Sequence, residues 1–147
     1  MKKKEVRAVL EALKKVKVMK IEPEEFRAQI ISIHLALLGV KRKIDEDVED
    51  LKAAILGPYT EDAKRVVELN REMMAEQDDA KKLAIAEKIN SFKGYLDASD
   101  AFSDAMGRLG EEEVTGLNPV SAEQFCREYQ KQDYDFDVVE KLYPLFG

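Results

Sequence analysis

The chain has 147 residues and a formal net charge of −6, with 45% apolar, 37% charged and 7% aromatic residues. This length is enough for one domain with its own core, and the high charged fraction is typical of helix-rich proteins. One cysteine and one histidine exclude an intramolecular disulfide, a cysteine-rich zinc site and a histidine-rich metal centre. Because there are only seven glycines and four prolines to form turns, we predict a single all-α domain over residues 1–147.

The sequence predicts no membrane span. Its most apolar stretch is residues 28–40, and 13 residues form a helix only about 20 Å long, whereas a bilayer core is about 30 Å thick. The lysines at the N-terminus are not followed by the apolar run of a signal peptide. We therefore expect a soluble, cytoplasmic chain.

Residues 4–18 predict a short, basic, amphipathic helix, because their apolar residues recur at helical spacing. These residues are Val6, Val9, Leu10, Leu13 and Val16. The alternation Val16-Lys17-Val18 leaves a second interpretation open, in which these residues are the end of an extended segment instead.

The most regular pattern covers residues 23–56. Pro23 suits the first position of a helix, and Glu24 and Glu25 place negative charge at its positive end. The apolar positions then advance by 29 residues in eight steps, about 3.6 per step, through Phe26, Ile30, Ile33, Leu37, Val40, Ile44, Val48, Leu51 and Ile55. We predict one long helix through Gly39, the alternative being two helices that meet there. Its first half is apolar on nearly all sides, so we expect that half to be buried.

Gly57-Pro58 ends this helix, and Thr60 is the predicted N-cap of the next one. The sequence leaves open whether residues 60–106 form one helix or break near Asp78-Asp79. Three glycines and a proline predict a loop over residues 107–119.

The C-terminal segment, residues 119–147, predicts two short helices. Ser121 and Gln124 have the spacing of a capping box that starts a helix running to about Gln132. A final helix is expected over residues 138–143 and ends before Pro144.

Charge is unevenly distributed along the chain. Residues 1–20 carry eight basic and two acidic side chains, a net charge of +6, and the remaining 127 residues carry a net charge of −12. The basic helix can be an ordinary solvated surface, can dock on an acidic surface, or can bind nucleic acid or anionic lipid. The nucleic-acid interpretation depends on Lys3, Arg7, Lys14 and Lys17.

No pattern predicts a metal, a cofactor or a catalytic group. Residues 133–137 (DYDFD) resemble the start of a calcium loop, but Val138 occupies the glycine position and Pro144 the position of the bidentate glutamate. His34 lies in the most apolar stretch, where a buried or helix-bridging histidine is expected, and Cys126 beside Phe125 is expected to be a small core residue. Because nucleophile and phosphate-binding motifs are also missing, we predict that the protein is not an enzyme.

Six of the eleven aromatic residues fall in the last 23 residues of the chain. Such a segment must bury its rings, either on the chain's own helices or on a partner. The candidate partner-binding residues are Tyr134, Phe136, Leu142, Tyr143, Leu145 and Phe146.

These patterns together predict an elongated helical hairpin or bundle, with shorter terminal helices covering the apolar half of the long helix. Bundles with highly charged arms usually present surfaces to other proteins. We therefore expect a non-enzymatic interaction or assembly protein that self-associates or serves as an accessory or adaptor in a larger complex, for example a phage- or secretion-type apparatus. The alternative is a nucleic-acid-associated regulator that uses the basic N-terminal helix.

Overall fold

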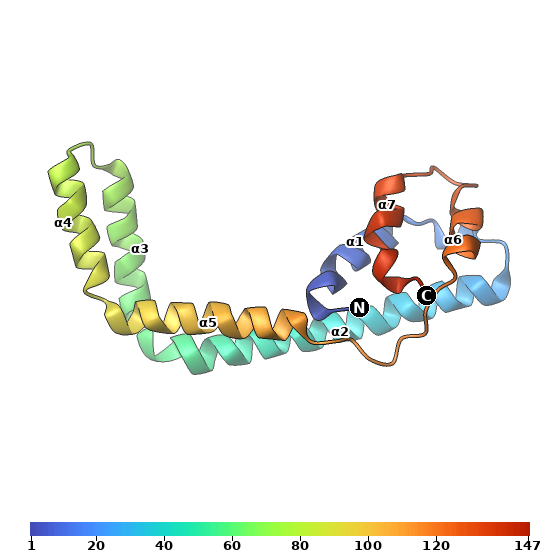
Figure 1. Ribbon diagram of the computed structural model, residues 1–147, viewed down its shortest axis with the longest axis horizontal. Coiled ribbons are helices and arrows are strands. Elements are labelled where there is room, and N and C mark those ends of the chain that lie inside the picture. The colour runs from blue at the N-terminus through green and yellow to red at the C-terminus, as the bar shows by residue number, and fades with distance from the viewer. The chain divides into compact units, whose positions relative to one another are not determined.

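The computed structural model describes all 147 residues and contains helices but no extended sheet (Figure 1). The seven α-helices are α1 (Val6–Lys15), α2 (Glu24–Leu56), α3 (Thr60–Ala75), α4 (Asp79–Asn90), α5 (Lys93–Glu111), α6 (Ala122–Tyr129) and α7 (Phe136–Lys141). Short 3₁₀ turns lie at Lys3–Glu5, Val18–Lys20, Gly57–Tyr59 and Tyr143–Leu145. The predicted all-α fold is confirmed.

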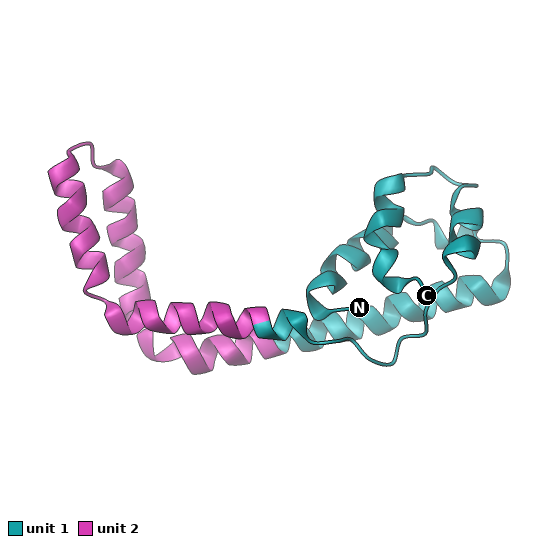
Figure 2. Ribbon diagram, viewed as in Figure 1, with its two compact units in different colours: residues 1–46, 108–147 teal, residues 47–107 magenta.

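The chain divides into two compact units (Figure 2). Unit 1 comprises residues 1–46 and 108–147, and unit 2 comprises residues 47–107. Helices α2 and α5 each contribute residues to both units. Each unit is described by itself below.

Unit 1 holds the main core, which is formed by α1, the first part of α2, α6 and α7. Its buried side chains are Val6, Val9, Leu10, Ala12, Leu13, Val16, Ile21, Phe26, Ile30, Ile33, Leu37, Val120, Phe125, Tyr129, Val138, Leu142 and Leu145. Residues far apart in the sequence therefore meet in one cluster, and the C-terminal segment is part of it.

Helix α1 is shorter than the predicted residues 4–18. It ends at Lys15, and Val16 takes an extended conformation with φ −82° and ψ 124°. Only Val16 is extended where the sequence left an extended segment open, since Val18 begins the 3₁₀ turn Val18–Lys20, and the Val16 side chain is buried in the core.

Helix α2 continues through Gly39 without a break, as predicted. The prediction that its first half is buried on nearly all sides is wrong. Helices of unit 1 cover only the face that carries residues such as Ile30 and Leu37, whereas Ile31, Leu35 and Leu38 on the opposite side are exposed.

The start of α3 differs from the prediction. Thr60 is already helical, with φ −58° and ψ −43°, so it is not the N-cap. The reason is that the 3₁₀ turn Gly57–Tyr59 leads directly into α3 and leaves no extended residue before it. The Thr60 hydroxyl instead donates a hydrogen bond to the Gly57 carbonyl, at 2.9 Å.

Residues 60–106 form three helices. Asp78 caps α4, because its Oδ1 atom accepts hydrogen bonds from the backbone amides of Ala80 at 2.9 Å and Lys81 at 3.3 Å. A second break falls at Ser91 and Phe92, where the sequence shows no glycine or proline. The new helix passes close to Tyr59: a Cβ atom on Gly94 would lie 3.0 Å from the Tyr59 ring.

The predicted loop over residues 107–119 begins later than expected, since α5 continues to Glu111. Gly107 and Gly110 both lie within α5, and a helix tolerates glycine. Gly107 faces open space, whereas a Cβ atom on Gly110 would come within 3.3 Å of the Lys4 Cβ, so glycine allows a close approach there. In the loop proper, Gly116 has a positive φ of 81°.

The predicted cap of α6 is confirmed. The Gln124 amide donates to the Ser121 hydroxyl at 3.2 Å, and the flanking Val120 and Phe125 side chains are both buried. The helix ends at Tyr129, three residues earlier than predicted, because residues 130–133 form a turn that leads to α7. No helix in the structure is both long enough and apolar enough to span a membrane.

Candidate interaction surfaces

The predicted partner-binding residues separate into a buried group and an exposed group. Leu142 and Leu145 belong to the core with exposed fractions of 1% and 5%, and Phe146 is half-buried with its ring 5.6 Å from that of Phe125. Tyr134, Phe136 and Tyr143 are exposed by 48%, 59% and 76%. The structure therefore uses part of the segment as core and leaves the other part at the surface.

The exposed aromatics are held by a well-anchored segment. The Asp135 carboxylate caps α7 by accepting the Asp137 amide at 3.0 Å, and the Tyr134 ring lies 5.5 Å from the buried ring of Tyr129. Farther along, the Val120 amide donates to the Leu145 carbonyl at 2.8 Å. These contacts fix the backbone that carries the exposed rings.

Two of the exposed rings flank Glu140 in the sequence. Phe136 and Glu140 lie one turn apart on α7, and Tyr143 begins the 3₁₀ turn Tyr143–Leu145 that follows this helix. Val138 and Leu142 lie on the opposite face and are buried in the core. We call Phe136, Glu140 and Tyr143 the α7 outer face.

The exposed aromatics of the whole chain are concentrated here. Of eleven aromatic residues, only Tyr134, Phe136 and Tyr143 are classed as exposed, and they lie within ten consecutive positions. Exposed aromatic groups of this kind mark interaction sites more often than single exposed aliphatic residues do.

Acidic side chains surround these rings, and most of them are engaged. Asp133 pairs with Lys17 at 3.0 Å and Asp137 with Lys141 at 2.9 Å, and these hydrogen-bonded lysines lower the pKa values of both carboxyl groups. Glu140 forms no ion pair. The carboxylates of residues 133–137 do not converge, since no three potential ligands in the structure are arranged to hold a metal ion.

The basic N-terminal segment is bound to acidic residues of its own unit. Lys2 and Lys4 both donate to the Glu111 carboxylate, and these hydrogen bonds lower the Glu111 pKa to about 2. Lys3 pairs with Glu112, and its amide also donates to the Glu112 carbonyl at 2.9 Å. The segment thus forms a short antiparallel bridge with the residues that follow α5.

The four nucleic-acid candidates do not form one free surface. Lys3 and Lys17 are engaged with Glu112 and Asp133, as described above. Arg7 and Lys14 are exposed on α1 and form no ion pair. Two of the four candidate cations are therefore left without an ion pair, both on this helix.

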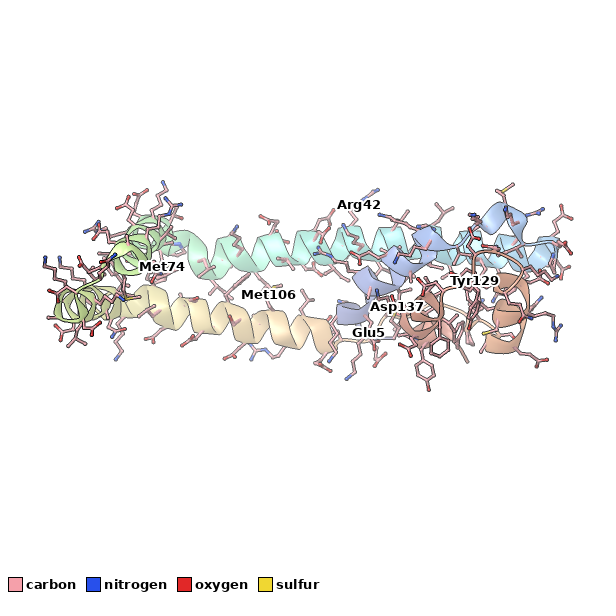
Figure 3. All side chains as sticks on the ribbon, turned by 90° about the horizontal axis from the view of Figure 1, so that it is seen from above. Glu5, Arg42, Met74, Met106, Tyr129 and Asp137 are labelled. Carbon is pink, nitrogen blue, oxygen red and sulfur yellow. The ribbon has the colours of Figure 1, made fainter.

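Helices α1 and α7 lie side by side and run in opposite directions (Figures 1 and 3). Charge–charge interactions couple Glu11 to Lys141 and Lys15 to Asp137, so the start of one helix lies near the end of the other. Consequently the α7 outer face and the exposed side of α1 adjoin on unit 1.

A groove that sequence reasoning missed lies within unit 2, between the end of α2 and α3. Its volume is about 760 Å³, and it is lined by Glu49, Lys52, Ala53, Leu56, Gly57, Thr60, Ala63, Lys64, Val67, Glu68, Arg71 and Tyr95. Apolar Leu56 and exposed Val67 form part of its wall, and charges of both signs surround them. The small residues Ala53 and Ala63 were the only sequence signal of this hollow.

The other candidate residues form no site. His34 and Cys126 are half-buried, and Cys126 packs against the core of unit 1. No family model, curated protein or solved structure matches this chain.

Proposed function

We propose that this chain is a non-enzymatic protein–protein interaction or assembly protein, an accessory or adaptor that acts by presenting helical surfaces. One observation carries the proposal: every exposed aromatic side chain lies between residues 134 and 143, on a segment anchored in the core. Tyrosine and phenylalanine rings supply much of the binding energy at protein interfaces.

The anchoring supports binding in a second way. A partner that meets a preformed surface does not have to order it, and the lost conformational freedom of the binding site is a major cost of association. The cap at Asp135 and the buried Val138, Leu142 and Leu145 set the positions of Phe136 and Tyr143 before any partner arrives.

The ion pairs of the N-terminal lysines do not support the nucleic-acid alternative. Phosphate binding depends on cations that are free to contact it. Lys2, Lys3, Lys4 and Lys17 are engaged with Glu111, Glu112 and Asp133.

Site-specific photo-crosslinking tests the proposal. A photo-reactive phenylalanine analogue placed at position 136 should give discrete cross-linked protein species in the cells in which the chain naturally functions. The same analogue at Glu87, an exposed polar position on α4, is the control and should give none. Equal cross-linking at both positions, or none at position 136, would contradict the proposal.

A further inference from the structure

We propose that the partner bound by the α7 outer face is a second copy of this chain, docked through a twofold-symmetric interface made of this face and the adjoining exposed side of α1. This inference rests on the proposed function, since it identifies the partner of the same surface.

The same surface contains both acidic and basic side chains, and a twofold interface requires such self-complementary groups. Phe136 and Tyr143 supply an apolar centre on α7, and Glu140 between them is an acid without an ion-pair partner. Arg7 and Lys14 on the neighbouring α1 are bases without an ion-pair partner, whereas Glu11 between them interacts with Lys141 of α7.

The side-by-side arrangement of α1 and α7 makes the pairing geometrically consistent. When a second copy is turned by 180° about an axis that lies in the interface, parallel to the two helices and midway between them, α1 of one copy faces α7 of the other. Glu140 of each copy then meets the free bases of its partner, and the rings of both copies gather near the axis. Each of these charges gains a partner that it lacks within one chain.

The apolar stripe Ile31, Leu35 and Leu38 on α2 does not offer this complementarity. An antiparallel copy centred on Leu35 would bring Arg42 of one chain close to Arg27 of the other. Like charges directly opposed weaken an interface. The α7 and α1 surface is therefore the one whose charges select a second copy.

Sedimentation of the purified full chain tests the inference. Wild-type protein should form a dimer within the range from about 1 µM to about 1 mM, where interfaces with few anchor residues fall. Phe136→Ser with Tyr143→Ser should weaken the dimer at least about tenfold. Leu83→Ser removes an equally exposed apolar side chain from α4 and is the matched control, which should dimerise as the wild type does. A chain that is monomeric throughout the range overturns the inference.

A charge exchange tests the twofold geometry. Glu140→Lys in one variant, and Arg7→Glu with Lys14→Glu in another, should each weaken self-association, because each places like charges across the axis. A mixture of the two variants should form a heterodimer, since every cross-axis pair then joins opposite charges. Melting curves close to that of the wild type show that all variants are folded. If the mixture stays monomeric, the twofold arrangement is wrong.

The two proposals fail in different ways. Cross-links from position 136 to another protein, with a monomeric purified chain, refute the second-copy partner and support the interaction function. Absence of any specific cross-link together with a monomeric chain refutes both.

Discussion

Leu142 and Tyr143 are sequence neighbours with opposite environments, 1% and 76% exposed. Leu142→Ala should lower the free energy of unfolding by about 2–5 kcal/mol, because it removes packed methyl groups from the core of unit 1. Tyr143→Ala should change it by less than about 0.5 kcal/mol, as exposed substitutions usually do. Denaturant unfolding of both variants measures the difference, and equal losses would contradict the described orientation of α7.

Glu111 should make the stability of the folded chain depend on pH. Its pKa is lowered from 4.5 to about 2 in the folded chain by the hydrogen bonds from Lys2 and Lys4. A lowered folded-state pKa stabilises the protein above the unfolded value, and this contribution is lost as pH falls from about 4.5 towards about 2. Glu111→Gln should therefore unfold with a shallower pH dependence than the wild type over this window.

The effect at Glu111 should be small, because the ion pairs are exposed and salt screens them. Unfolding titrations at low and at high ionic strength provide the control. A difference between wild type and Glu111→Gln that grows with added salt would contradict the electrostatic origin.

The sequence located the aromatic C-terminal segment but did not show which of its residues are buried. Tyr134, Phe136, Leu142, Tyr143, Leu145 and Phe146 were predicted as one group. The orientation of α7 decides which of them become core, and a helix of six residues is too short for its apolar period to reveal that orientation. Lys3, Arg7, Lys14 and Lys17 were predicted as one basic group, but Lys3 and Lys17 pair with Glu112 and Asp133, which are remote in the sequence.

Among the elements, α2 offers a direct test at Gly39. No atom lies within 4 Å of the position that a Cβ would take, so Gly39→Ala should stabilise the protein by about 0.5–1 kcal/mol through higher helix propensity. Thermal or denaturant unfolding checks the gain. Gly110→Ala is the comparison and should gain less, because its Cβ would press on Lys4 at 3.3 Å.

Local signals predicted α2, from its apolar period and its flanking prolines, and the cap of α6 at Ser121. They left the break at Asp78 open and predicted the wrong cap, Thr60, for α3. The break at Ser91 and the continuation of α5 past Gly107 were missed. These two features depend on tertiary packing, for example of Tyr59 against Gly94. Helix propensity reflects single residues and does not report such contacts.

For the molecule as a whole, deletion of residues 133–147 should lower the melting temperature sharply or leave the protein insoluble. The deletion removes three buried side chains, Val138, Leu142 and Leu145, together with the backbone bonds to Val120. Burial of a large apolar side chain contributes about 1.5–3 kcal/mol, so the combined loss approaches the stability of a domain, about 5–15 kcal/mol. A truncated chain that melts cooperatively near the wild-type temperature would contradict this expectation.

The overall charge should prevent nucleic-acid binding. With a net charge of −6 and most N-terminal lysines paired, the chain should not retard a generic DNA duplex at about 150 mM salt. An electrophoretic mobility assay measures this, and retardation that weakens steeply as salt rises would favour the nucleic-acid regulator.

The division of unit 1 into residues 1–46 and 108–147 affects the order in which the chain acquires structure during synthesis. The core face of α2, including Phe26 and Leu37, is made early, but its partners Val138 and Leu142 are made roughly a hundred residues later. At translation rates of about 5–20 residues per second, that face has only α1 as a partner on the ribosome for about 5–20 s. The contacts between α3 and α4 are local in sequence and become available much sooner. We therefore expect the inserted unit to form first, and the nascent chain to expose a binding site for chaperones until α7 has emerged.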